Sequence, residues 1–135
     1  MSNFAATVSE WAQKVDGALE LIFKEACQEL VTQLNAIVPV ATGFLRASLV
    51  ASTTAMPMIR QTDGDIPGDL GEIVLVIAGA EIGDVLYLGY CASYAAYVHY
   101  GANGRPGRPW VDMVAQRWQQ IVAAKAAEVK ARLGL

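Results

Sequence analysis

The residues best suited to chemistry lie in the segment YVHYGANGRPGRPW, residues 97–110. Its three glycines, Gly101, Gly104 and Gly107, would leave backbone amides open to an anion such as phosphate. A phosphate-binding loop also requires a strand before it, a helix directly after its last glycine and usually a Gly-Lys-Ser/Thr ending, which this segment does not have. Pro106 and Pro109 remove two further amides. The pattern therefore disfavours nucleotide binding.

Catalytic and metal-binding side chains are few. His99 is the only histidine, and a lone histidine beside tyrosines is more often a hydrogen-bonded core or interface residue than a catalytic base. We find no paired carboxylates on an ordered element and no candidate lysine nucleophile. Cys27 and Cys91 fit two unpaired, buried thiols, with a disulfide as the alternative, and with His99 they are too few for a metal site. We expect no enzyme activity, cofactor or metal.

Composition indicates one globular domain spanning residues 1–135, with 54% apolar and 17% charged residues. The high apolar share favours a subunit interface, although the abundance of alanine is a second explanation. The longest apolar run, IVLVIAGA at 73–80, is far shorter than the roughly 20 residues of a membrane span. The start lacks a basic region and a cleavage site, so we expect neither a membrane segment nor a secretory signal.

Charge is segregated along the chain, whose net charge is −3. All charged residues between 63 and 90 are acidic, whereas residues 91–135 carry an excess of Arg and Lys. Such segments can pair within the fold or between neighbours in a head-to-tail ring, and solvated faces without a partner are the equal alternative. The acidic balance disfavours non-specific DNA binding except through a local basic loop.

The chain begins and ends with helical patterns. Apolar residues recur every three or four positions over 4–36, and Thr7 with Glu10 resembles a capping box that would start the regular helix there. Pro39 should end this helix, and Glu20 and Lys24 should pair along it. Pro109 and Trp110 should open a final helix that reaches about Leu133. The expected apolar positions are Phe4, Val8, Trp11, Val15, Leu19, Ile22, Ala26, Leu30 and Leu34, then Trp110, Val114, Trp118, Ile121, Val122, Val129 and Leu133.

Strand patterns and turn residues fill the middle of the chain. Residues 44–54 alternate with period two, which predicts a strand, with or without a turn of helix at its start. Residues 55–71 predict a long, exposed, mobile loop. The run at 73–80 predicts a buried strand that forms a hairpin with residues 85–90. A short helix should precede Gly101. The fold class is therefore α+β, with a long N-terminal helix, a small antiparallel sheet and a C-terminal helix packed on it.

Aromatic and arginine side chains are the candidate contact residues. Trp11 and Trp118 lie on helical stripes and should be core residues, whereas Tyr97, Tyr100 and Trp110 suit core and interface equally. Arg105 and Arg108 are either solvated or reach a neighbouring subunit's carboxylates. The candidate interface residues are Arg46, Tyr97, His99, Tyr100, Arg105, Arg108 and Trp110, and those of the loop are Met58, Arg60, Asp63, Asp65 and Asp69.

Two segments, PVATGFLRAS and YAAYVHYGANGRPGRPWV, together resemble the head-tail joining or tail-completion (neck) proteins of long-tailed bacteriophages. That family shows Pro-x-x-Thr-Gly-x-Leu-x-x-Ser after a long first helix, then Tyr-Ala-x-Tyr-Val-x-Tyr/Phe-Gly, a Gly/Pro loop and a final helix led by an aromatic residue. The matching positions are Pro39, Thr42, Gly43, Leu45 and Ser48, then Tyr94, Ala95, Tyr97, Val98, Tyr100 and Gly101, then Pro109 and Trp110. His99 stands where a glutamate is common, and Trp110 where a phenylalanine is usual.

The resemblance implies a structural virion protein without catalysis, assembled in the host cytoplasm into a ring at the head-tail junction. A hexamer is expected from it, with a dodecamer as the alternative. The implied partners are a portal, adaptor or stopper ring and tail tube proteins, with DNA only as passing cargo. The loop at 55–71 would order on a neighbouring ring or line the channel. Two rivals remain: a DNA-handling protein using Arg60, Arg105 and Arg108, and an enzyme with a concave site around His99.

Overall fold

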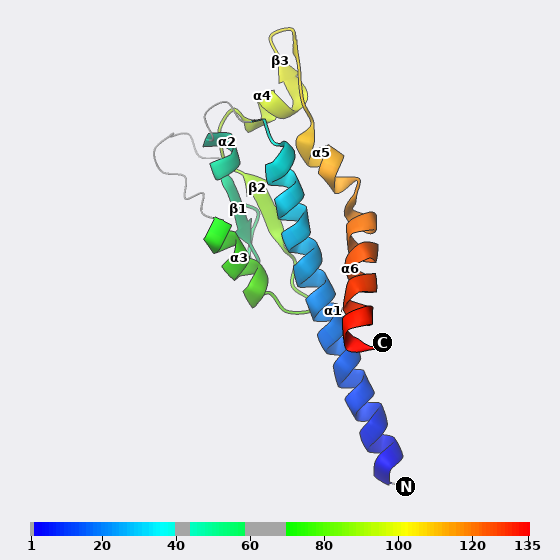
Figure 1. Ribbon diagram of the computed structural model, residues 1–135. Helices are drawn as coiled ribbons and strands as arrows, with labels where there is room; N and C mark the ends of the chain where they lie inside the picture. The colour runs from blue at the N-terminus through cyan, green and yellow to red at the C-terminus, as the bar shows by residue number, and fades with distance from the viewer. Residues whose placement is uncertain (1, 40–43, 59–69) are drawn as a thin grey trace.

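Helix α1 (Ser2–Ile37) runs along the molecule, and the other elements gather around its C-terminal half (Figure 1). The computed structural model describes residues 2–39, 44–58 and 70–135. The helix ends before Pro39 as predicted, because proline cannot continue it. It begins at Ser2 and not at Thr7, so the predicted capping-box start is wrong: Ala5 and Ala6 favour helix and extend it. Lys24 Nζ and Glu20 Oε1 lie 2.9 Å apart, which confirms that pair.

The main sheet has two antiparallel strands, β1 (Leu49–Ser52) and β2 (Tyr87–Tyr90), paired from Leu49 with Tyr90 to Ser52 with Tyr87. The strand predicted at 44–54 is therefore shorter than expected. Helix α2 (Phe44–Ala47) occupies its start, where the Ser48 hydroxyl donates to the Leu45 carbonyl at 2.7 Å and closes a helical turn. Of the predicted loop at 55–71, residues 59–69 lie outside the described part of the chain.

Residues 70–79 form a helix, α3 (Leu70–Gly79), and the strand predicted there is wrong. Ile73 and Ile77, four positions apart, are buried, while Leu75 between them is 73% exposed. One helical stripe thus enters the core, whereas a strand buried on both faces would hide every side chain. The predicted hairpin between 73–80 and 85–90 is wrong for the same reason, since the partner of β2 is β1, from a distant part of the chain.

Two buried clusters hold these elements together. The first joins α1 and α2 to the segment after β2 and to α5 (Trp110–Ala115). The second joins α1 to β1 and α3. Their buried members are Leu34, Val38, Leu45, Ala92, Trp110 and Val114 in the first, and Cys27, Val31, Leu49, Ile73 and Ile77 in the second.

The C-terminal helical pattern is divided into α5 and α6 (Trp118–Leu133), so the single helix predicted from Trp110 to Leu133 is interrupted at residues 116–117. The predicted apolar positions Val114, Ile121 and Val129 are buried. Trp118 is half-buried against the second cluster, in agreement with its predicted packing role. The two helices lie along α1 and reach the sheet through the tryptophans at their starts.

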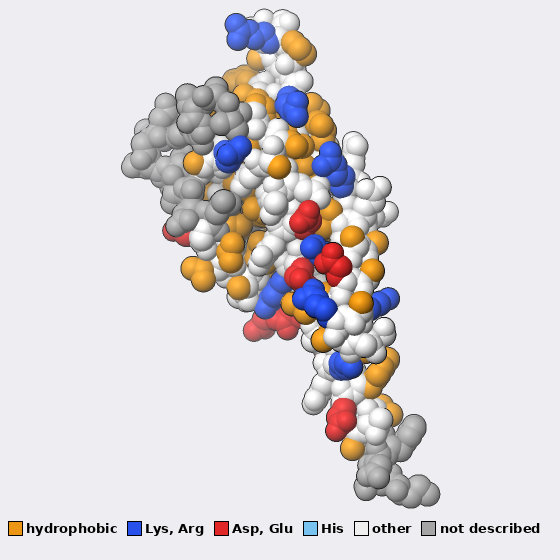
Figure 2. Space-filling view, in the orientation of Figure 1, with side chains coloured by type: hydrophobic (Ala, Val, Ile, Leu, Met, Phe, Trp, Pro, Cys, Tyr) orange, Lys and Arg blue, Asp and Glu red, His pale blue; other side chains and the backbone are white. Residues whose placement is uncertain are grey.

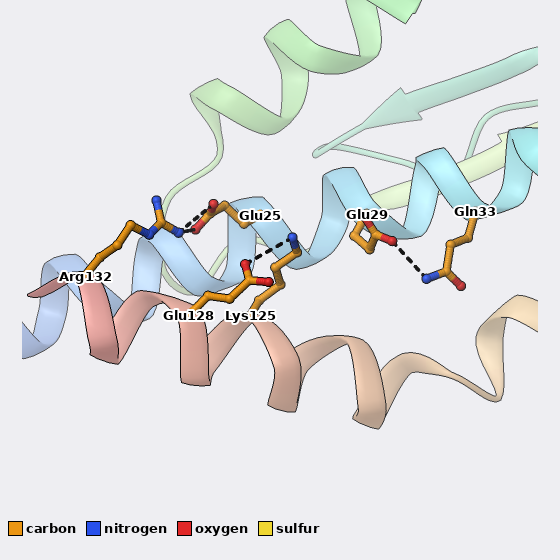
Figure 3. A network of polar contacts seen from close by, with 6 residues as sticks. All are labelled: Glu25, Glu29, Gln33, Lys125, Glu128 and Arg132. Atoms are coloured by element: carbon orange, nitrogen blue, oxygen red, sulfur yellow. Dashed lines mark hydrogen bonds and ion pairs between the residues drawn. The ribbon is translucent and has the colours of Figure 1, made fainter.

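Polar contacts also join α1 to α6 (Figure 3). Arg132 Nη2 donates to both carboxylate oxygens of Glu25, at 2.8 and 2.6 Å, across the two helices. On α6 itself, Lys125 and Glu128 pair at 3.4 Å. Gly134 ends α6 in a left-handed conformation with φ 68°, which glycine adopts without steric cost.

The N-terminal half of α1 departs from the predicted core. Val8, Trp11 and Leu19 are 48%, 60% and 53% exposed. Figure 1 shows that α1 projects beyond the end of α6. Trp11 and Leu19 line an open pocket with Lys130, Gly134 and Leu135 at the C-terminal end of the chain, which leaves both more than half exposed. The prediction that Trp11 is a core residue is therefore wrong.

The glycine-rich segment is a hairpin. Helix α4 (Ala95–Tyr100) stops at Gly101 as predicted, and β3 (Gly101–Ala102) then pairs with β4 (Arg105–Pro106). The two residues between these strands, Asn103 and Gly104, both have positive φ, at 53° and 76°. Asn-Gly is the dipeptide most typical of such a tight turn, and this signal was missed in the sequence.

Gly107 should tolerate no side chain, because a Cβ there would overlap the backbone of His99, Tyr100 and Gly101. We expect Gly107→Ala to lower the free energy of unfolding by about 2–3 kcal/mol in urea denaturation. Gly104→Ala is the matched control: it has open space around it and a φ of +76°, so it should cost about 1 kcal/mol. Equal losses in the two variants would contradict the close approach at Gly107.

Candidate functional site

Helix α4 presents two tyrosines outward and one histidine inward. Tyr97 and Tyr100 are 65% and 76% exposed, whereas His99 is 6% exposed. The outward pair lies three positions apart, on one side of the short helix. The α4 turn and the hairpin after it therefore carry an aromatic edge at one end of the molecule (Figure 1).

The His99 ring lies in a chain of edge-to-face aromatic contacts. Its centroid is 4.4 Å from that of Tyr100 and 5.4 Å from that of Trp110, and Trp110 in turn lies 5.2 Å from Tyr90. Of the two positions expected for His99, core or interface, its burial is that of a core residue. The expected hydrogen bond is not observed: neither ring nitrogen has a hydrogen-bond partner among the described residues.

An open groove of about 570 Å³ lies beside these rings. Its walls come from α1, the sheet, α4, α5 and the start of α6, and most of the side chains along them are apolar. The lining includes Leu30, Leu34, Leu88, Tyr90, His99, Tyr100, Trp110, Asp112 and Trp118. A concave site at His99, which the enzyme hypothesis required, is therefore present.

The polar groups of the groove are few and close together. Asp112 Oδ2 lies 3.9 Å from His99 Nε2, and the Asp112 side chain is 62% exposed. The indole Nε1 of Trp110 is buried and makes no hydrogen bond of good geometry in the described structure. An apolar trough with one exposed acidic group suits the binding of an amphipathic side chain.

Tyr90 anchors the floor of the groove. Its hydroxyl donates to Asn35 Oδ1 at 3.1 Å, which ties β2 to α1. Burial raises the pKa of Tyr90 to about 12, against smaller lowering effects of the Trp110 indole and of the positive charge on Arg46. Arg46 itself is exposed on α2.

The two loop arginines have different surroundings. Arg105 is exposed on β4. Arg108 is also exposed, but its Nε donates to the Ile37 carbonyl at 3.3 Å, and its backbone N–H donates to Val98 O at 2.9 Å, so it ties the hairpin to the end of α1. Of the loop candidates, Met58 is 82% exposed, whereas Arg60, Asp63, Asp65 and Asp69 lie outside the described residues. Trp110 is 1% exposed and belongs to the floor of the groove.

Part of the basic C-terminal charge is paired within the fold. Arg132 contacts Glu25, and Arg117 Nη1 donates to Gln33 Oε1 at 3.2 Å, so both side chains reach α1. Glu72, Glu81 and Asp84 of that segment are exposed. Figure 2 accordingly shows acidic and basic side chains side by side along the lower half of the molecule.

Cys27 and Cys91 are buried and do not form a disulfide with each other. Within residues 2–39, 44–58 and 70–135, no three His, Cys, Asp or Glu side chains gather as metal ligands would. The helices of the same ranges include none with the length and apolar character of a membrane span.

Comparison with known proteins gave no relatives: no protein family and no curated protein matches the sequence, and no solved structure matches the fold.

Trp110 should be the most costly aromatic side chain to remove. We expect Trp110→Ala to lower the free energy of unfolding by about 3–5 kcal/mol, because it leaves a cavity where two other rings pack. Tyr97→Ala, on the exposed side of α4, should change it by less than about 0.5 kcal/mol. Chemical denaturation followed by circular dichroism measures both free energies. Similar losses in the two variants would contradict the placement of Trp110 in the core and of Tyr97 on the surface.

Stability should fall at alkaline pH through Tyr90. Its folded-state pKa lies above the unfolded value, so the unfolded chain loses the phenol proton first and is stabilised relative to the folded protein as pH rises from 10 towards 12. Over this window the wild type should lose about 2 kcal/mol that Tyr90→Phe does not lose. Denaturation at a series of pH values tests this prediction. Parallel stability–pH profiles of the wild type and Tyr90→Phe would show that burial does not raise the pKa of Tyr90.

Proposed function

We propose that this chain is a structural virion protein of a tailed bacteriophage, which forms a ring at the head-tail junction, completes the tail and joins it to the DNA-filled capsid. The observation that carries the proposal is that the two segments resembling neck proteins pack against each other. Leu45 of the first lies in the same buried cluster as Trp110 of the second, with Tyr94 and Val98 packed beside it. The carbonyl of Ser48 accepts a hydrogen bond from Cys91 N at 2.9 Å.

The resemblance therefore concerns residues that build one unit of structure. Ser48 is fully buried, and its hydroxyl is bonded to the backbone. Gly101 has a φ of +92°, and a Cβ there would lie 2.7 Å from the carbonyl oxygen of Arg105. A pattern with a physical requirement at several positions is stronger support than the same letters scattered over unrelated surfaces.

The surface around this unit suits assembly. Tyr97 and Tyr100 stand exposed beside the hairpin, and tyrosine is enriched in protein interfaces because its ring is apolar and its hydroxyl can bind a partner. A ring needs two different complementary patches on each subunit. The aromatic edge of α4 and the exposed half of α1 are two such patches, at opposite ends of the molecule (Figure 1).

The test is electron microscopy of lysates from the parent phage with this gene interrupted. Filled heads separate from free tails, joined after addition of purified protein, would support the joining role. Tails of abnormal length would instead indicate a tail terminator. Normal infectious particles would overturn the proposal and favour a DNA-handling role, which a steep fall of DNA affinity with salt would then reveal.

The aromatic edge gives a sharper prediction. We expect Tyr97→Ser/Tyr100→Ser protein to fold with only a small drop in the midpoint of thermal unfolding, from loss of the Tyr100 ring contact with His99, but to restore far fewer joined particles than the wild type. Leu75→Ser is a control, since it removes a similarly exposed apolar side chain on α3, away from the candidate contact residues. Full rescue by the double variant would exclude this edge as a contact.

A further inference from the structure

The N-terminal arm, residues 5–17 of α1, has an apolar stripe that is largely exposed and is bordered at Trp11 and Val15 by the C-terminal end of the chain. Val8 and Trp11 are 48% and 60% exposed, and Val15 continues the stripe on the same side of the helix. An isolated helix of this length is marginal in water, so packing of the stripe would stabilise it. Figure 2 shows apolar side chains beside charged ones at this projecting end.

The groove beside His99 has the complementary property. It is an open apolar trough whose buried histidine, 6% exposed, keeps both ring nitrogens without a hydrogen bond. Both nitrogens are shielded from solvent, so the groove offers an incoming side chain mainly apolar surface. The single acidic group of the lining, Asp112, lies 3.9 Å from the histidine and is exposed to an approaching cation.

Trp11 and Lys14 of the arm are complementary to the apolar trough beside His99 and to the carboxylate of Asp112. They are three positions apart and so lie on neighbouring parts of one helix face. An indole offers a large apolar ring, which suits the apolar trough beside His99. Lys14, one turn further on, would then lie where it can pair with Asp112.

We propose that the N-terminal arm of a second copy of this chain occupies the groove, with Trp11 against His99 and Lys14 against Asp112. The arm and α5 lie towards opposite ends of α1, so a subunit cannot fill its own groove (Figure 1). The contact joins two different surfaces and therefore propagates from copy to copy until a ring closes. It rests on the proposed function in assigning this contact to the neck ring.

Disulfide trapping tests the contact directly on the full-length protein. Lys14→Cys combined with Asp112→Cys should give covalent dimers and higher oligomers on mild oxidation, whereas the native Cys27 and Cys91 are buried. Gln13→Cys with Asp112→Cys is the matched control, because residue 13 lies on the opposite side of the arm from Trp11. Absence of oligomers with the first pair, or equal yields with both, would overturn the proposal.

Charge exchange gives an independent test by sedimentation velocity. Lys14→Glu and Asp112→Lys should each weaken self-association about tenfold or more, and the double exchange should restore much of it. Trp11→Ser should abolish association while far-UV circular dichroism shows folded protein. A wild type that is monomeric at every concentration, or association unaffected by Trp11→Ser, would overturn the proposal. Trapped oligomers together with normal particles from the gene interruption would instead overturn only the neck function.

Discussion

Trp110 lies where α1, β2, α4 and α5 meet, with its ring edge-to-face with Tyr90 on one side and His99 on the other. It is also the first residue of α5, directly after the glycine-rich hairpin. Burial of this one ring therefore determines where the hairpin leaves the core and which side of α4 faces inward. Because His99 packs on the indole, Tyr97 and Tyr100 are left on the outer side.

The molecule divides along α1 into a packed part and an exposed part. Its C-terminal half contributes to both buried clusters and binds α6 through Glu25 and Arg132, whereas its first turns project beyond α6 and leave Trp11 largely exposed. Apolar surface left over after one core is complete is available for association. The high apolar content is thus shared between a small core and surfaces that suit neighbouring copies.

The residues shared with the neck-protein pattern are mainly those that the fold itself needs. Ser48 completes a buried turn, Gly101 admits a close backbone approach, and Leu45 packs in the first cluster. Between them stand exposed side chains such as Tyr97, which the fold does not require. The buried and backbone-constrained residues explain why the pattern can mark a fold. The exposed residues are the ones that would determine which partner binds.

Local signals in the sequence determined the long first helix and its end at Pro39, the short helix stopped at Gly101, and the apolar face of α5 and α6, because helical periodicity and proline or glycine stops act within a few residues. Asn103-Gly104 could also have been recognised as a turn. Features that depend on contacts between distant parts of the chain were decided only by the tertiary structure. The run at 73–80 became a helix and β1 found β2, since a short apolar run suits either state until its neighbours select one. Trp11 and Trp110 both lie on helical stripes, and only the presence or absence of an adjacent element made one exposed and the other core.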